Sequence, residues 1–288
     1  MSFGVLTLST PSDYQKAIGL ALSLRISNPG VPIAVACWPP SVCKLLEPYL
    51  DHVIEQDPSI KGFEHKVNLD RYSPFQETFF FDSDVLIFKP LSEILDDWKT
   101  QPYTACGSYA TDGFSAFGLD KALVLKRIGK DRLVQIDGAG HAYFRKPECQ
   151  GIFDLAREIT ANYADYAGNI RYADEDVMNI AMTILGLRPM PHGNFFSRHL
   201  SAVRGTMDMD ASVGRCRFNA VVTGQVQEPH MMHFAAREAS FAYTAQLRKL
   251  YRRFGVSTDG LLKLALSDFY VLHIKWPFKT AVRNLLGK

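Results

Sequence analysis

Residues 79–88 read F-F-F-D-S-D-V-L-I-F and set two aspartates, Asp82 and Asp84, between two apolar runs. Such runs are typical of a strand that is buried on both faces, so we expect the aspartates where the strand ends and loosens into a loop. Side chains at i and i+2 of an extended chain point the same way, and burying two unpaired carboxylates is costly. A divalent cation with oxygen ligands is the simplest counter-charge, and such an ion keeps open positions for substrate phosphates.

Short apolar runs alternate with helical periodicity along the chain before this segment. We expect strands at 3–8, 32–38, 52–55 and 78–88, and helices at 12–27 and 41–49. Weaker signals place later strands at 103–108, 140–145 and 231–234, and helices at 151–163 and 175–185. This alternation predicts an α/β fold, with a mostly parallel sheet flanked by helices and ligands bound at the carboxyl ends of the strands.

Charge is unevenly distributed along the 288 residues, whose net charge is only +2. Residues 245–288 hold nine Lys or Arg against Asp259 and Asp268, a net charge of +7. We therefore expect a main domain at 1–244 and a basic, aromatic helical tail at 245–288. The tail mixes apolar and basic residues at 247–254 and at 276–279, which favours an anionic membrane surface as partner. The alternative is that its apolar residues pack on the main domain while its cations stay solvated.

Cysteine usage favours a reducing compartment. The five cysteines are odd in number, scattered and without a C-x-x-C pair, which argues against a disulfide scaffold or a zinc ribbon. The sequence has no 18-residue uncharged apolar span, and its start has no basic leader or cleavage signal. We expect a cytoplasmic protein that can bind a membrane surface peripherally, and we expect no nucleic-acid partner.

The D-x-D pattern is a weak signal by itself, because charged residues are common and the tripeptide occurs three times. The other copies are 174–176 and 208–210. Only Asp82-Ser83-Asp84 is framed by apolar runs on both sides, and this context indicates a metal site. Solvated carboxylates in a loop at the end of a strand are the alternative.

The opening stretch 6–14, L-T-L-S-T-P-S-D-Y, together with the framed D-x-D, resembles the GT-A nucleotide-sugar glycosyltransferases. The resemblance is to the retaining group that includes glycogenin and bacterial lipopolysaccharide galactosyltransferases. It implies that Leu8, Thr10 and Tyr14 hold the base of a sugar nucleotide, for which an aromatic face and strand-end backbone groups are suited. Tyr14 alone would equally fit an aromatic residue that packs on the sheet.

The same resemblance assigns phosphate contacts. Lys66 lies sixteen residues before Asp82, where the family has a basic residue that contacts the donor diphosphate. A lysine is a point charge on a flexible stem and suits phosphate oxygens. Ser83 is implied as a further donor contact, and Asp82 and Asp84 as ligands of manganese or magnesium. Without the resemblance, Lys66 would be taken for an ordinary surface lysine.

Residues 172–179, Y-A-D-E-D-V-M-N, resemble the family's D-Q-x-x-x-N helix start. The resemblance places Asp174 and Asn179 beside the transferred sugar, as catalytic residues, with Glu175 where the family has Gln. A helix N-cap is the alternative for Asp174 and is compatible with that role.

Residues 229–234, P-H-M-M-H-F, resemble the late strand whose His completes the metal site. His233 fits better than His230, and imidazole can join two carboxylates around manganese. A histidine packed in an apolar core is the alternative.

The chain departs from the family pattern in two places. The family has Gly and then Lys after this His, whereas this chain has Ala236 and Ala239, with Arg237 as the nearest cation. The family's N-x-G strand appears here as residues 138–140, Gly-Ala-Gly, without the Asn. Both departures affect the expected contacts to phosphate and sugar.

The resemblance implies a metal-dependent hexosyltransferase that retains anomeric configuration. The donor would be a nucleotide sugar, of which a UDP-sugar is the first choice, and the acceptor a glycan, a lipid-linked sugar or a protein. Metal and Lys66 would stabilise the departing diphosphate, and Asp174 would stabilise the sugar cation or orient the acceptor.

Two other functions stay open from the sequence. In a phosphatase that forms an aspartyl phosphate, Asp82 would attack and Asp84 would handle the proton, although two or three strands precede a motif that normally ends the first strand. A non-catalytic protein that binds sugar nucleotide or glycan would account for the missing lysine.

Overall fold

The computed structural model describes residues 2–138, 140–191, 193, 196–198, 202–203, 205–234, 240–275 and 277–278. The chain divides into two compact units. The first unit comprises Met1–Leu8, Val31–Asp82 and Ser92–Gly193, and the second comprises Ser9–Gly30, Ser83–Leu91 and Asn194–Lys288. The boundary passes between Asp82 and Ser83, within the D-x-D segment.

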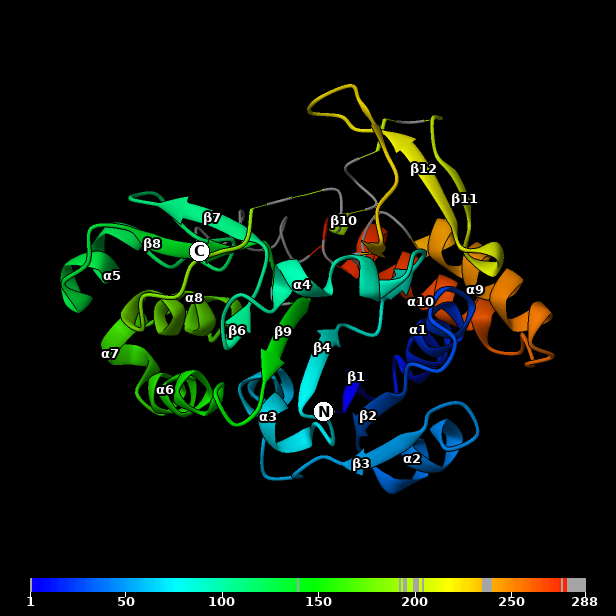
Figure 1. Ribbon diagram of the computed structural model, residues 1–288, viewed down its shortest axis with the longest axis horizontal. Coiled ribbons are helices and arrows are strands. Elements are labelled where there is room, and N and C mark those ends of the chain that lie inside the picture. The colour runs from blue at the N-terminus through cyan, green and yellow to red at the C-terminus, as the bar shows by residue number, and fades with distance from the viewer. Residues whose placement is uncertain are drawn as a thin grey trace. The chain divides into compact units, whose positions relative to one another are not determined.

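A six-stranded sheet forms the centre of the first unit (Figure 1), with strand order β3-β2-β1-β4-β9-β6. The strands are β1 (Phe3–Ser9), β2 (Ile33–Cys37), β3 (His52–Glu55), β4 (Glu77–Phe81), β6 (Tyr103–Thr104) and β9 (His141–Arg145). β1 and β4 are parallel, as are β2 and β3, whereas β9 runs antiparallel to both β4 and β6. The mostly parallel α/β sheet predicted from the sequence is confirmed.

Helices cover this sheet. They are α2 (Pro40–Leu46), η1 (Gly62–Asn68), α3 (Leu69–Tyr72), η2 (Leu91–Glu93), α4 (Leu95–Trp98), α5 (Lys121–Ile128), α6 (Gln150–Ala161), α7 (Tyr163–Ala167) and α8 (Asp174–Ile184). On one face of the sheet, Phe80 belongs to a core that includes Phe153 of α6 and Val177 of α8. On the other face, the Phe79 ring meets the Trp98 ring at a centroid distance of 5.1 Å. Neighbouring residues of β4 point to opposite faces, so the apolar run reflects cover on both sides.

A two-stranded ribbon, β7 (Gly107–Ala110) and β8 (Leu133–Ile136), lies beside α8 in the first unit. The outward N–H groups of β8 donate to side chains of α8. Val134 N–H reaches Thr183 Oγ1 and Ile136 N–H reaches Asn179 Oδ1, each at 2.8 Å. Thr183 and Asn179 are four residues apart, so they lie one above the other on the helix face, and here that face takes the place of a neighbouring strand.

The described part of the second unit contains two three-stranded sheets, with orders β10-β14-β5 and β11-β12-β13. Its elements are α1 (Tyr14–Ser27), β5 (Val85–Ile87), β10 (Phe196–Arg198), β11 (Asp208–Asp210), η4 (Ala211–Val213), β12 (Arg215–Asn219), β13 (Val226–Gln227), β14 (Met231–His233), α9 (Ser240–Arg253), α10 (Leu261–Tyr270) and η5 (Val271–Lys275). β14 runs parallel to β10 and antiparallel to β5.

α9 packs closely against α1 within the second unit. A Cβ added at Gly19 would lie 2.1 Å from Cδ2 of Leu247, so glycine is required for this approach. The Tyr251 hydroxyl donates to the Gln15 carbonyl at 2.8 Å, and Leu250 is fully buried. The apolar residues of the expected tail segment 247–254 that lie on this face of α9 therefore belong to the core of the second unit.

Two strand predictions were wrong. Residues 103–108 divide between β6 and β7, which belong to different sheets. Residues 78–88 do not form a single strand, because β4 ends at Phe81 and β5 begins at Val85, with Asp82, Ser83 and Asp84 between them. β4 pairs with β1 and β9, whereas β5 pairs with β14 in another sheet. Apolar residues on both sides of the aspartates are buried in either arrangement, so the pattern does not distinguish one long strand from two short ones.

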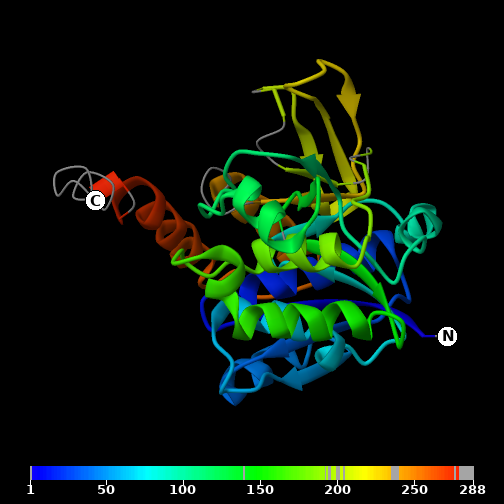
Figure 2. The same cartoon turned by 90° about the vertical axis from the view of Figure 1, so that its left-hand side faces the viewer.

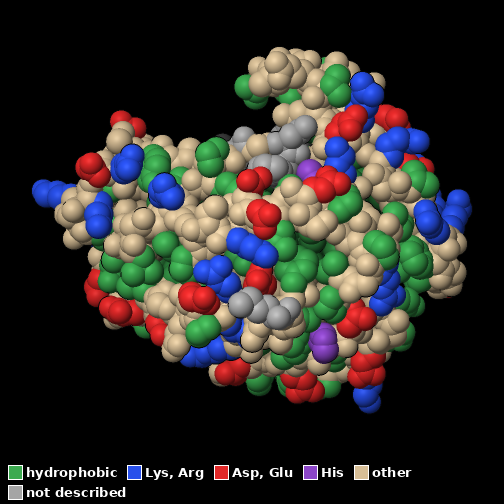
Figure 3. Space-filling view, in the orientation of Figure 1, with side chains coloured by type: hydrophobic (Ala, Val, Ile, Leu, Met, Phe, Trp, Pro, Cys, Tyr) green, Lys and Arg blue, Asp and Glu red, His purple; other side chains and the backbone are tan. Residues whose placement is uncertain are grey.

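None of the described helices combines the length with the apolar character needed to cross a membrane. The face drawn in Figure 3 carries acidic and basic side chains interspersed among apolar ones, as an ordinary solvated surface does.

Candidate active site

The segment Asp82-Ser83-Asp84 leaves the carboxyl end of β4 as a turn held by backbone hydrogen bonds. Asp82 N–H donates to the Gly140 carbonyl at 2.9 Å within the first unit. In the second unit, Phe234 N–H donates to the Asp84 carbonyl at 3.0 Å, and the hydroxyl of Tyr243 donates to the Ser83 carbonyl at 3.3 Å. Both carboxylates therefore extend from backbone that is fixed on each side.

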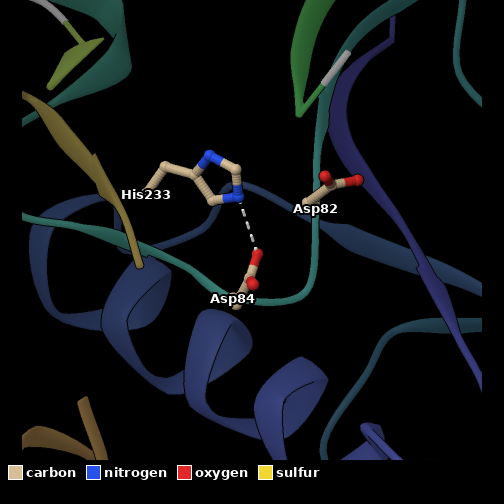
Figure 4. A group of neighbouring side chains, drawn as sticks. All are labelled: Asp82, Asp84 and His233. Atoms are coloured by element: carbon tan, nitrogen blue, oxygen red, sulfur yellow. Dashed lines mark ion pairs between the residues drawn. The ribbon is translucent and has the colours of Figure 1, made fainter. Parts of the chain in front are cut away.

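His233 reaches Asp84 because β14 pairs with β5. Their register sets His233 opposite Val85, the residue after Asp84. His233 Nε2 lies 3.0 Å from Asp84 Oδ1, and Figure 4 shows the imidazole turned toward the carboxylate. His233 therefore lies next to a carboxylate rather than in a wholly apolar core, and metal binding by His233 rather than His230 stays a prediction.

Asp82, Asp84 and His233 fit a divalent metal ion. One ligand atom from each lies within 4.8 Å of the other two. His233 Nε2 and Asp84 Oδ1 are only 3.0 Å apart, so both could reach one ion. Two carboxylates and one imidazole are a donor set that suits manganese and admits magnesium.

Lys66 of η1 joins Asp82 to Asp174 at the start of α8, entirely within the first unit. Its Nζ lies 2.9 Å from Asp82 Oδ1 and 3.3 Å from Asp174 Oδ2. Burial would lower the pKa of Lys66, but the two carboxylates outweigh it and raise this pKa above its ordinary value. Lys66 is therefore a buried cation with two carboxylate partners, not a surface lysine. Its expected contact to a donor diphosphate stays a prediction.

Arg157 of α6 holds the segment that carries Lys66. Its guanidinium donates to the Val67 carbonyl at 3.0 Å and to Asp70 Oδ1 at 2.8 Å. These bonds fix the backbone on the C-terminal side of Lys66. No pattern in the sequence indicates this role, because an arginine in a helix is ordinarily a solvated residue.

Asp174 is the first residue of α8, and the cap position is taken by Ala173, so Asp174 is not the N-cap. It is buried and is held by Lys66. Asn179 is also buried, and its Oδ1 accepts the bond from Ile136 described above. Asn179 thus has a structural role, and the sugar contact expected of it stays a prediction.

The predicted base-binding residues lie at the carboxyl end of β1 and just after it. Because β1 and β4 are parallel neighbours, Leu8 and Asp82 lie at the same edge of the sheet. Leu8 is half-buried against the core of the first unit. In the second unit, the exposed Thr10 donates through Oγ1 to Asp13 Oδ1 at 2.9 Å, and the half-buried Tyr14 is the first residue of α1. Base binding by these three residues stays a prediction.

The structure describes only one of the two places where the chain departs from the family pattern. Ala236, Arg237 and Ala239 lie outside the described residues. Gly140, from the altered N-x-G segment, supplies the carbonyl that accepts from Asp82 N–H. The backbone of this segment thus supports the turn at Asp82 even though the family's Asn side chain is absent.

Comparison with known proteins identifies similar folds but no close relative. No protein-family model and no curated protein matches the sequence. The structure is similar to that of the galactosyltransferase LgtC in complex with donor and acceptor sugar analogs, with a TM-score of 0.54 and 15% identity over 92% of this chain and 95% of that one. An active-site glutamine-to-glutamate mutant of LgtC gives a TM-score of 0.53 and 16% identity, covering 88% and 95% of the two chains.

The bifunctional glycosyltransferase WbbM in its apo form gives a TM-score of 0.54 and 11% identity. That match covers 88% of this chain but only 51% of WbbM, so this chain corresponds to about half of that protein. At these identities the similarity establishes the fold, which is the GT-A fold expected from the sequence resemblance. The fold alone does not determine the function, which depends on the residues of the site.

Proposed function

We propose that this protein is a metal-dependent glycosyltransferase that moves a hexose from a nucleotide sugar, of which a UDP-sugar is the first choice, to a sugar-bearing acceptor. One observation carries the proposal: Asp82, Asp84 and His233 offer a metal donor set at the carboxyl edge of the sheet. Ligands of open α/β sheets bind at that edge. Such an ion can neutralise the negative charge with which the diphosphate of a sugar nucleotide leaves.

The roles of the chain's own residues follow from charge and position. Asp82, Asp84 and His233 would hold the ion, which when bound neutralises charge on the diphosphate. Lys66 would add a buried positive charge and keep Asp82 and Asp174 in fixed orientations. Asp174 would face the sugar, where a carboxylate stabilises positive charge that develops as the glycosidic bond breaks. Transfer with retention is expected from the family resemblance.

A panel of sugar nucleotides tests the proposal. Wild-type protein with manganese should release nucleoside diphosphate from at least one of them, and chelation of the metal should stop the reaction. Asp84→Asn should lose this turnover, whereas Asp208→Asn, which changes the exposed D-x-D of β11, should keep it. Phosphate release from small phosphomonoesters would indicate a phosphatase instead, and binding without turnover a non-catalytic protein.

We further propose that the acceptor side operates at an anionic membrane surface, through α10 rather than α9. Leu247, Leu250 and Tyr251 of α9 are buried and cannot insert into a bilayer in this structure. Along α10 and the helical turns after it, exposed apolar residues recur at spacings of three to four, as in an interfacial helix. They are Leu262, Leu266, Phe269, Tyr270, Ile274 and Phe278. Figure 2 shows α10 and η5 as one continuous red rod.

Vesicle co-sedimentation at low salt tests this surface. Full-length protein should sediment with anionic vesicles, and the double variant Leu262→Asp, Leu266→Asp should stay in the supernatant. Val222→Asp is the matched control, because Val222 is an exposed apolar residue in the hairpin between β12 and β13. Point variants are preferable to deletion of 245–288, which would remove the buried residues of α9. Wild-type protein that stays in the supernatant, or equal loss in the control, would contradict the proposal.

A further inference from the structure

Phe63 presents an aromatic ring directly beside the cation of the candidate site. Phe63 is 49% exposed, and Lys66 Nζ lies over its ring, 5.6 Å from the ring centroid. Both residues belong to η1, a 3₁₀ helix, in which side chains three residues apart lie one above the other. Single exposed apolar residues are normal on protein surfaces. The contact with Lys66 distinguishes this ring from the others.

The backbone of η1 is supported near both of its ends. The helix begins at Gly62, whose φ of 56° lies in the left-handed region that favours glycine. Near the other end, the Arg157 guanidinium donates to the Val67 carbonyl at 3.0 Å. The ring of Phe63 therefore extends from a fixed backbone, and a ligand that packs on it loses little affinity to ordering of this segment.

The ammonium of Lys66 is enclosed on one side and accessible on the other. Phe80, whose ring centroid lies 5.8 Å from Nζ, is buried, and so is Asp174. The neighbours that reach solvent are Phe63 and Asp82, and the side chain of Lys66 is itself 12% exposed. A ligand therefore approaches the ammonium past Phe63 and Asp82, and all five residues belong to the first unit.

A phosphate bound by Lys66 brings the sugar that it carries within reach of Phe63. An ammonium-to-phosphate bond of about 2.8 Å, added to the 5.6 Å between Nζ and the ring centroid, sets that oxygen no farther than about 8.4 Å from the centroid. A ring that packs on an aromatic side chain has its centre about 4.5–7 Å from that of the side chain. A sugar ring attached to the phosphate can therefore pack on Phe63.

We propose that Phe63 packs on the C–H face of the hexose that the donor carries, and so helps to select the donor sugar. This inference rests on the proposed transferase function. Lys66 contacts Asp82, which would lie at the diphosphate, and Asp174, which would face the sugar. The neighbouring ring is therefore placed for the transferred sugar. A hexose packs its C–H face on an aromatic ring, while its hydroxyl groups bond to polar partners such as Asp174.

Calorimetry with full-length protein and manganese tests the contact. Phe63→Ala should weaken the binding of a UDP-hexose about three- to tenfold, as expected for one aromatic packing contact, and should leave the affinity for UDP unchanged. An unchanged affinity for UDP also shows that the variant is folded. Phe63→Tyr keeps the face of the ring and should restore the binding of the UDP-hexose. Phe114→Ala is the matched control, because Phe114 is a 69% exposed ring between β7 and α5 of the same unit, and it should change neither affinity.

Two outcomes would overturn the contact and leave the transferase proposal standing. The first is an equal affinity of wild-type protein and Phe63→Ala for every UDP-hexose that the wild type binds. The second is an equal weakening of UDP and UDP-hexose, because the ring would then act on the nucleotide or through Lys66.

A hexose 1-phosphate, with inorganic phosphate as the reference, separates the contact from the transferase proposal, because this probe contains no nucleotide. Binding of the hexose 1-phosphate that depends on Phe63, in a protein that turns over no sugar nucleotide, would support the contact and refute the transferase. Wild-type protein that binds neither a UDP-hexose nor a hexose 1-phosphate would overturn both.

Discussion

Replacing Lys66 with methionine should destabilise the fold and weaken nucleotide binding without weakening metal binding. Methionine keeps the length of the side chain but removes the charge that lies 2.9 Å from Asp82 Oδ1 and 3.3 Å from Asp174 Oδ2. Asp174 bears most of the effect, because its side chain is only 6% exposed, whereas that of Asp82 is 25% exposed and can be solvated.

The magnitude follows from the burial of the pair. Removing one partner of a buried ion pair costs about 3–5 kcal/mol, because the other charge stays buried without compensation. Since Asp82 is partly solvated, we expect a loss near the lower end, about 3 kcal/mol of unfolding free energy. The double variant Lys66→Met, Asp174→Asn should recover much of this loss, because it leaves no uncompensated charge at position 174.

Urea unfolding and calorimetry together check the reasoning. The matched control is Lys89→Met, which breaks a more exposed pair with Glu228 at 3.3 Å and should cost no more than about 1 kcal/mol. In Lys66→Met, UDP should bind more weakly, whereas manganese alone should bind at least as tightly because a nearby positive charge is gone. Equal losses of stability in the two methionine variants would refute the ion-pair argument. An unchanged affinity for UDP would refute the diphosphate contact.

Two further predictions concern the metal ligands and α8. His233→Ala should lower the affinity for manganese at least about tenfold by isothermal calorimetry, whereas His230→Ala should leave it unchanged, and equal losses would contradict the choice of His233. Burial raises the pKa of Asp176 above its ordinary value of 3.8, although hydrogen bonds from Ser115 and Tyr163 oppose the shift. The charged carboxylate therefore destabilises the fold above its folded-state pKa, and this penalty disappears as the pH falls through that pKa toward 3.8. Asp176→Asn should accordingly raise stability in urea unfolding at neutral pH and have a smaller effect near pH 4, and an effect that is independent of pH would contradict this account.

The sequence predicts a candidate site residue where the neighbours of that residue along the chain are distinctive. Asp82 and Asp84 can be singled out because apolar runs frame them, and His233 because residues 229–234 resemble the family's late strand. The paired position of Lys66 was not recognisable, because it depends on η1, β4 and α8 meeting in three dimensions. The bond from the Ser115 hydroxyl to Asp176 was likewise invisible, since neither residue is unusual in its own segment.

The tail, residues 245–288, is a second place where the sequence pattern does not predict the packing. α9 and α10 both mix apolar residues with cations, so their periodicity predicts two amphipathic helices and not which of them is covered. In the structure, Leu247 of α9 fills the space that Gly19 leaves on α1, whereas Leu262 of α10 stays exposed. Burial here depends on a glycine more than two hundred residues away, which no local pattern reveals.

The contact between β8 and α8 has a consequence for self-association. A strand at the end of a ribbon ordinarily exposes N–H groups to which a strand of another molecule can bind. Here Thr183 and Asn179 accept the N–H groups of Val134 and Ile136, so a foreign strand finds these donors already occupied. Replacing both with alanine would leave these two buried N–H groups without acceptors, and the expected result is a loss of stability and a weaker barrier to strand addition. By closing the ribbon with helix side chains, the chain protects itself against polymerisation without adding another strand.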